Sequence, residues 1–411
     1  MSTRKTRVTV LFNDLEELER AFADTPEGIS SSSSIVITGS NQWVQHRTTI
    51  GLPNHFEPLR ITWKATKPLN YTLQAPLMEG MNIYSSKSSQ HPSLANSISS
   101  AKYNLMHSEA IDEALIREIL PVEIAGINFT INEDRHYDIL LDRQTLKIDE
   151  YYALDVGKTQ NISYSPELGK FELGLFFPES NNDLEVNLNG ARCSWTDDGV
   201  MEQCKKTYLF YQRAHFAPIE ADSYPVRLLE PVGLHPTVSV DLTNAEMVEK
   251  CAFYMYLTTP ADLFMDKFDT SPIFLAGATD LEAPEYRIVK EVWGMESLLE
   301  LTPGMVNDVK LHTRYVLPQS VKSSKSVRFT PHIFQACDSG SDSIHENPFY
   351  TKSLGFDSLF TNDTIFKHFN TPTLELAIPA ADSNDYEFVR STTWACLIIS
   401  VLYLCLKILR K

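Results

Sequence analysis

The chain has 411 residues, of which 43% are hydrophobic and 10% aromatic, so it is too apolar for a disordered protein. Its net charge of −17 argues against a nucleic-acid-binding protein, because such a protein needs a basic surplus to neutralise phosphates. Residues 391–411 carry three basic residues and no acidic one, so residues 1–390 carry −20. The length is typical of two domains.

Short apolar segments with period-two alternation follow one another along the chain, which predicts β-strands. Helical periodicity is confined to residues 14–23 and 108–120. We therefore expect a mainly β fold of two β-sandwich-like domains, residues 1–185 and 186–388, divided near the polar PESNND segment. The expected strands are residues 7–12, 60–65, 127–132, 171–177, 184–188, 206–211, 237–242, 253–257, 309–316 and 327–329.

Four cysteines lie outside the apolar C-terminal run. Cys193 and Cys204 flank an Asp197-Asp198-Gly199 turn between two expected strands, and such a hairpin would bring the two thiols together. Cys251 and Cys337 would then form a second disulfide over a long loop. The alternative is four reduced, buried thiols.

The C-terminal run WACLIISVLYLCL, residues 394–406, has thirteen residues and no charge. Together with its flanks it predicts a transmembrane helix over residues 391–409, in which Lys407 can extend its charged end toward the headgroups. The alternative is a buried core helix, which usually fits a run of this length. Basic residues follow the run and acidic residues precede it, which places residues 410–411 in the cytosol.

The location of residues 1–390 is less directly encoded, because the N-terminus shows no signal peptide. A lone C-terminal anchor could leave them in the cytosol. Four N-glycosylation sequons, at Asn70, Asn128, Asn161 and Asn362, together with the paired cysteines, favour a lumenal body.

The sequence shows none of the common catalytic motifs. It has no glycine-rich phosphate loop, no HExxH and no GxSxG, and no DxD pair that would hold a cation against a sugar phosphate. His312 could act as a general base, but no nucleophile is evident, and a structural His312–Arg314 pair is the plainer interpretation. His235 is read in the same way. We expect a binding or assembly protein without a cofactor or metal, and not an enzyme.

Several segments resemble the PIG-X family, and in particular its fungal branch, over essentially the whole chain. The family-wide segments are Gly233-Leu234-His235-Pro236, Leu263–Phe268, Asp280–Tyr286, His312–Tyr315 and Cys337-Asp338. The segments similar to the fungal branch are Arg7–Asn13, Arg60–Trp63, Arg192-Cys193, Trp293-Gly294, Asn347–Tyr350 and Leu354–Phe360.

The resemblance implies a single-pass glycoprotein of the endoplasmic-reticulum membrane with a lumenal body. It implies a non-catalytic, stabilising subunit of glycosylphosphatidylinositol (GPI) mannosyltransferase I, which adds the first α-1,4-mannose to the GPI-anchor precursor. The implied partners are a multi-spanning, PIG-M-like catalytic subunit and membrane lipid. A chaperone-like role in maturation of other secretory proteins is implied for the fungal branch, and a general lumenal chaperone is the alternative function.

Three segments are candidates for contact with the catalytic subunit. They are the turn with Gly233, His235 and Pro236, the strand with His312, Arg314 and Tyr315, and the turn with Asn347, Phe349 and Tyr350. The alternative is that these residues only specify the fold.

Overall fold

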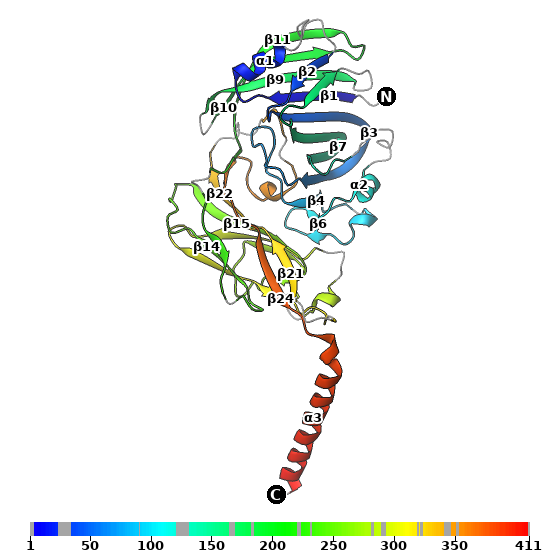
Figure 1. The fold of residues 1–411 in the computed structure, drawn as a ribbon, viewed down its shortest axis with the longest axis vertical. Helices are drawn as coiled ribbons and strands as arrows, with labels where there is room; N and C mark the ends of the chain where they lie inside the picture. Colours follow the sequence, from blue (N-terminus) through cyan, green and yellow to red (C-terminus); the bar gives the residue numbers. More distant parts are fainter. Residues whose placement is uncertain are drawn as a thin grey trace.

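The computed structural model describes residues 4–23, 34–89, 91–120, 131–163, 169–181, 185–219, 223–230, 232–280, 283–288, 293–318, 320, 324–340, 347–350 and 353–409. Strands dominate the described chain, as the alternating patterns predict. Figure 1 shows two β-rich halves stacked along the long axis, with one helix projecting from the second half. The mainly β fold with a single C-terminal apolar helix is therefore confirmed.

A nine-stranded sheet forms the first half, in the order β11-β10-β9-β1-β3-β4-β6-β5, with β7 paired to β3. The long β3 pairs with β7 along most of its length, and with β1 and then β4 on its other edge. The strands are β1 (Arg4–Leu11), β3 (Trp43–Lys64), β4 (Gly80–Ser85), β5 (Ile98–Ser99), β6 (Asn104–Ser108), β7 (His136–Ala153), β9 (Lys170–Asn181), β10 (Glu185–Trp195) and β11 (Met201–Gln212).

Two helices and a strand pair accompany this sheet: α1 (Leu15–Ala23), α2 (Glu113–Ile119), and β2 (Ser34–Thr38) with β8 (Thr159–Ser163). The helix predicted over residues 108–120 is too long at its start. Ser108 ends β6, and the Asp112 side chain accepts a hydrogen bond from the Leu115 amide, 2.9 Å away, which caps α2. Most of the strand predicted at 127–132 lies outside the described residues, and Ile131 and Asn132 are not in a strand.

The second half packs several sheets around one apolar core drawn from β14, β15, β18, β21, β22 and β24. Alternation orients these strands: in β24 every second side chain is buried. Its six-stranded sheet contains β12 (His215–Phe216), β15 (Cys251–Thr259), β17 (Phe274–Gly277), β18 (Met295–Leu301), β22 (His332–Asp338) and β23 (Thr364–His368). The other strands are β13 (Val226–Leu228), β14 (Thr237–Asp241), β16 (Leu263–Phe264), β19 (Val306–Lys310), β20 (His312–Thr313), β21 (Ser324–Phe329) and β24 (Leu374–Pro379).

The first sheet continues past residue 185, where the sequence predicts a domain boundary. β10 pairs with β9 on one side and with β11 on the other, so the sheet extends to Gln212. Gly190 makes this pairing possible, because a Cβ there would lie 1.9 Å from the Leu175 carbonyl oxygen. The division into two domains remains a prediction. The arrangement of the sheets would fit a domain boundary just after Gln212, where the last strand of the first sheet ends.

A segment from the second half, of which residues 347–350 and 353–360 are described, is packed against the first sheet. Buried Arg47 donates to Asp149 and to the Phe349 carbonyl, while buried Arg60 donates to Asp138 (2.8 Å) and to the Leu354 carbonyl (2.7 Å). We call these two stretches, residues 347–350 and 353–360, the docking segment, because they tie the two halves together.

The described residues also include four short 3-10 helices: η1 (Pro92–Leu94), η5 (Glu285–Arg287), η7 (Phe356–Leu359) and η8 (Ser383–Asp385).

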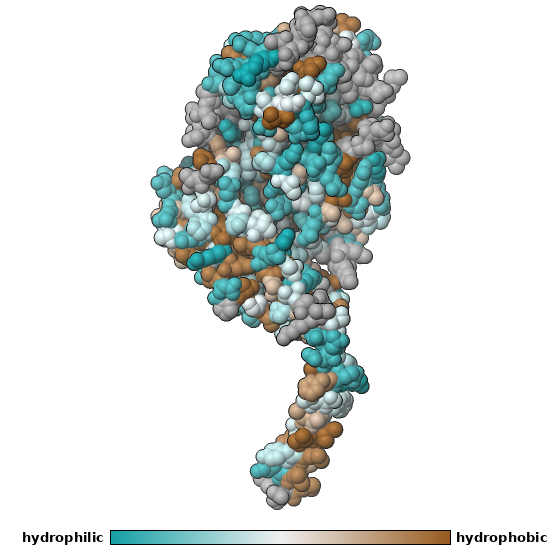
Figure 2. All heavy atoms as spheres, viewed as in Figure 1, coloured by the Kyte–Doolittle hydropathy of each residue, from teal (hydrophilic) through white to brown (hydrophobic). Residues whose placement is uncertain are grey.

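The helix α3 (Tyr386–Leu409) has no buried residue and is long and apolar enough to cross a membrane. Figure 2 shows its brown, hydrophobic surface standing free of the body. The alternative of a buried core helix does not hold, because no part of the described chain covers α3.

Candidate functional site

Three of the segments that carry the family-wide resemblance meet in the second half. β16 and β20 pair through Leu263 with Thr313 and Phe264 with His312. The turn before β14 joins them, since the Thr313 amide donates to the Leu234 carbonyl at 2.9 Å. Segments that are far apart in sequence therefore line one hollow of about 250 Å³. Its lining residues are Leu234, His235, Phe264, Asp266, His312, Thr313 and Tyr315. We call it the motif hollow.

A pair of histidines forms one wall of the motif hollow. The Nδ1 atoms of His235 and His312 are 2.8 Å apart, so one must donate and the other accept. The His312 ring stacks on Phe264 with centroids 5.1 Å apart, and its Nε2 lies 3.6 Å from Asp269 Oδ2. Burial, with a smaller effect of His235, lowers the pKa of His312. Burial therefore favours the neutral form of His312, which is hydrogen-bonded to His235.

The hollow lacks the parts of a nucleophilic site. Of the residues that line the hollow, Thr313 is the one with an aliphatic hydroxyl group. That hydroxyl donates a hydrogen bond to the Leu234 carbonyl at 3.3 Å. That bond points the hydroxyl at backbone and away from the histidine nitrogens, so no nucleophile–base pair is formed there. The geometry can bind a partner group but shows no arrangement for covalent catalysis.

Arg314 lies behind the hollow and is almost completely buried. Its guanidinium donates to the carbonyls of Ala278 (2.8 Å), Asp280 and Ala283 (2.7 Å), and lies 4.5 Å from the Phe264 ring centroid. The expected His312–Arg314 pair is therefore not formed. Arg314 instead holds the backbone at Ala278, Asp280 and Ala283, and its buried charge is balanced by the dipoles of these carbonyls.

The candidate contact residues differ sharply in accessibility. Gly233, His235 and Tyr315 are exposed, Tyr315 by 72%, whereas Pro236 and Arg314 are buried. Phe349 and Tyr350 are buried too, with Asn347 beside them, in the docking segment between the two halves. This third candidate turn cannot meet a partner in the folded chain, because it is occupied by the chain's own first sheet.

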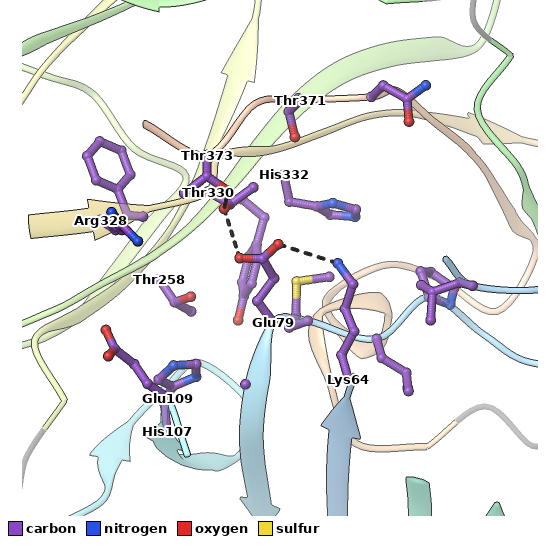
Figure 3. Close-up of a pocket in the computed structure, with 18 of the residues that line it drawn as sticks. Lys64, Glu79, His107, Glu109, Thr258, Arg328, Thr330, His332, Thr371 and Thr373 are labelled. Carbon is purple, nitrogen blue, oxygen red and sulfur yellow. Dashed lines mark hydrogen bonds and ion pairs between the residues drawn. The ribbon is translucent and has the colours of Figure 1, made fainter. Parts of the chain in front are cut away.

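A larger cleft of about 400 Å³ lies between the two halves. Figure 3 shows that Lys64 and Glu79 reach it from the first sheet and Thr330 and His332 from the second half. Glu79 joins the two sides, since it accepts from Thr330 at 2.9 Å and pairs with Lys64 at 3.6 Å. These charges are already matched within the chain, so the cleft is a polar seam between the halves.

His332 forms a cluster with two further histidines, His215 and His368, beside this seam. His215 Nδ1 is 3.1 Å from His368 Nε2, and the His332 and His368 rings stack 5.0 Å apart. Burial lowers the pKa of His332 to about 3, with Lys64 and His215 adding to the effect. Across residues 4–409, in the parts that the structure describes, no three His, Cys, Asp or Glu side chains are placed to share a metal ion.

Both disulfides lie at directly paired positions of neighbouring strands. Cys193 and Cys204 are partners in β10 and β11, and Cys251 and Cys337 are partners in β15 and β22. The hairpin around Asp197-Asp198-Gly199 has the arrangement expected from the sequence.

The sequons differ in exposure. Asn161 and Asn362 are exposed, while Asn70 is half-buried and its side-chain oxygen accepts from the Thr72 amide at 3.0 Å. Asn128 lies outside the described residues. The structure therefore leaves Asn161 and Asn362 as the sites most open to a glycan.

Comparison with known proteins tests the resemblance directly. The family model described as "PIG-X / PBN1" matches residues 231–409, which include the motif hollow and α3. Protein PBN1 of Saccharomyces cerevisiae is 39% identical over 98% of this chain and 96% of its own length. The chain belongs to the PIG-X/PBN1 family. Similar proteins named PBN1 occur in Eremothecium gossypii (35% identical, 98% of this chain, 97% of the relative) and Kluyveromyces lactis (29%, 98% and 96%).

Two groups of site residues were not recognised from the sequence. Phe264, Asp266 and Asp269 surround the histidine pair; the resemblance covered the first two but did not assign them a role. The buried arginines Arg47 and Arg60 were also missed. The sequence did contain a signal for both, because each is a charged residue in a stretch rich in apolar or β-branched residues. Arg60 begins an expected strand, and Arg47 lies within the long β3.

Proposed function

We propose that this chain is the non-catalytic, stabilising subunit of an endoplasmic-reticulum GPI mannosyltransferase I. The complex adds the first α-1,4-mannose to the GPI-anchor precursor, and catalysis belongs to a multi-spanning, PIG-M-like partner. The observation that carries the proposal is membership of the PIG-X/PBN1 family over the full chain. The single apolar C-terminal helix supports it, because it suits a single-pass protein packed beside a larger membrane partner.

The proposed orientation has residues 1–390 in the lumen and the C-terminus in the cytosol. The two disulfides support a lumenal body, because such bonds persist in oxidising compartments. Lys407 at the distal end of α3, with Arg410 and Lys411 in the sequence beyond it, supports a cytosolic C-terminus.

The proposed contact with the catalytic subunit is the motif hollow. Gly233, His235 and Tyr315 present an exposed rim, and His312 lines the interior, so a lumenal loop of the partner could insert a polar side chain toward the histidine pair. Pro236 and Arg314 would position this surface from behind. A subunit that binds only the folded enzyme raises the enzyme's stability by mass action, by about 2.7 kcal/mol at a hundredfold excess over Kd.

Acute depletion of the protein tests this proposal. We expect the catalytic mannosyltransferase to disappear and the unmannosylated GPI precursor to accumulate, while unrelated lumenal glycoproteins keep their normal maturation rates. The alternative function is a general, membrane-anchored chaperone that affects GPI synthesis indirectly. Misfolding of many unrelated clients before any loss of the mannosyltransferase would favour that alternative and contradict the subunit proposal.

A further inference from the structure

The junction between the body and α3 is unusually short. α3 begins at Tyr386, directly after η8, and Asn384 in η8 donates to the Ser320 carbonyl at 2.7 Å. The helix is thus fastened to the body with no spacer. Figure 1 shows α3 leaving the base of the second half near β21 and β24.

The charge pattern of α3 fixes how deep this junction lies. The last charged residues before the apolar run are Glu387 and Arg390, and the sixteen residues from Ser391 to Leu406 carry no charge. They rise about 24 Å as a helix, close to the hydrocarbon thickness of a thin bilayer, so Arg390 lies at its edge. Tyr386 is then about 6 Å farther out, which is about the thickness of the headgroup layer.

The body presents an apolar side chain beside this junction. Leu317 is 55% exposed, although it is large and apolar. Pro318 follows it and, with Tyr386 and Val389 of α3, lines a mainly apolar hollow of about 580 Å³ in the angle between body and helix, whose other lining residues are Ala381, Asp382, Ser383 and Asp385. We call Leu317, Pro318, Tyr386 and Val389 the base patch.

We propose that the base patch is a lipid-binding surface, so that the body rests on the bilayer and does not swing above it. The inference builds on the membrane-spanning role of α3 in the proposed function. Tyrosine and leucine are suited to the headgroup boundary, where one end of a side chain is apolar and the other wet. The continuity of the patch with α3 identifies the occupant as phospholipid, and a tilt of α3 toward the side of the patch brings the patch closer to the membrane.

Site-specific photocrosslinking of the purified full chain in phosphatidylcholine vesicles tests the inference. Benzoylphenylalanine is placed singly at Leu317, Phe210 or Leu402. Phe210 in β11 is an aromatic control with 71% exposure, at the end of the molecule away from α3 in Figure 1. Leu402 within α3 is 57% exposed and matches Leu317. Thermal melting confirms that each variant is folded.

The expected result is lipid adduct at position 317 within about threefold of that at 402, and at least about tenfold above that at 210. Labelling at 402 with only background labelling at 317 would overturn the base-patch proposal while leaving the membrane span intact. Absence of lipid adduct at 402 as well would overturn the span itself. Adducts from 317 to a membrane protein in place of lipid, when the same variant is probed in microsomes, would assign the patch to a protein partner and also contradict the proposal.

Discussion

Arg314 shows how a single side chain organises the candidate site. A guanidinium has five donors in a fixed plane. Here they reach the carbonyls of Ala278, Asp280 and Ala283, while the flat face of the guanidinium lies over the Phe264 ring. Lysine could not replace it, since an ammonium group at the end of a flexible chain cannot span the three acceptors. The residue thus supports this backbone behind the motif hollow, while His235 and His312 form its accessible wall.

Substitution of the two neighbours separates support from recognition. Arg314→Ala leaves buried carbonyls unpaired and should lower the free energy of unfolding by about 2–4 kcal/mol. His312→Gln keeps a hydrogen-bonding side chain and should change stability by less than about 1 kcal/mol while weakening association with the catalytic subunit. Thermal unfolding and co-purification measure the two effects. A large loss of stability in His312→Gln would make that histidine a fold-specifying residue and remove it from the proposed interface.

The buried histidines predict a dependence of stability on pH. Burial lowers the pKa of His107 and His136 to about 4 and that of His332 to about 3. Below pH 6.5 the unfolded chain takes up protons that these folded side chains resist, so stability is full above pH 7 and falls toward pH 4. Each histidine should cost up to about 2 kcal/mol between pH 7 and pH 5.

Thermal melts at pH 7.5 and pH 5.0 measure this effect. The melting temperature should fall at pH 5.0, and His332→Gln should reduce the size of the fall. The matched control is His55→Gln, because His55 is exposed on β3 and its replacement should leave the pH dependence unchanged. Equal melting temperatures of the unmodified chain at both pH values would refute the prediction.

Among the elements, the docking segment joins the two halves through buried hydrogen bonds. Its Phe349 and Leu354 carbonyls accept hydrogen bonds from arginines of β3 that are themselves paired with aspartates of β7. A second tie is Glu296 in β18, which accepts from Tyr103 at 2.6 Å and Tyr256 at 2.7 Å, and whose pKa is raised by burial. The halves are therefore joined by buried polar contacts as well as by apolar packing.

Arg60→Ala should be strongly destabilising, because it leaves Asp138 as an unpaired buried charge and frees the Leu354 carbonyl. The expected loss is about 3–5 kcal/mol. The control is Arg20→Ala in α1, where an exposed pair with Glu16 should contribute less than about 0.5 kcal/mol. Chemical denaturation measures both variants. If Arg60→Ala unfolds at the same denaturant concentration as Arg20→Ala, the docking segment does not hold the halves in the way described.

Strands with a short run of apolar or β-branched residues were predictable from the sequence even where both faces are buried. β1 and β14 each have three consecutive buried residues and β9 has five, and all three strands were expected, whereas β24, in which every second side chain is buried, was not. The expected strand over 309–316 is instead divided into β19, which ends at Lys310, and β20, which ends at Thr313, just before Arg314 turns to the carbonyls of Ala278, Asp280 and Ala283. A contact between residues so far apart leaves no local signal in the sequence.

At the scale of the whole molecule, two features were the hardest to predict from the sequence. They are the extent of the first sheet and the position of the turn at residues 347–350. The NPFY turn has the polar and aromatic composition of an exposed binding loop, and Phe349 is nevertheless 1% exposed. Its burial depends on strand β3, about 300 residues earlier, which no local pattern can reveal. The motif hollow was found more readily, because the resemblance identified most of its lining residues before their contacts were known.

Topology gives a prediction for the entire body. In microsomes, endoglycosidase should increase the mobility of the protein, and Asn161→Gln and Asn362→Gln should each reduce the shift by one step, because both sites are exposed. Asn70→Gln should have a smaller effect, since its side chain is held in a turn. Digestion of the body by protease added outside intact microsomes would place residues 1–390 in the cytosol and contradict the lumenal orientation.

The most direct test of the account is to purify the tagged full chain from endoplasmic-reticulum membranes in a mild detergent. The account predicts that one multi-spanning mannosyltransferase co-purifies in a fixed ratio, and that mannose transfer to the GPI precursor follows this partner. The chain freed of the partner should transfer none. Mannose transfer by the chain alone, or recovery of many unrelated lumenal clients without the mannosyltransferase, would contradict it.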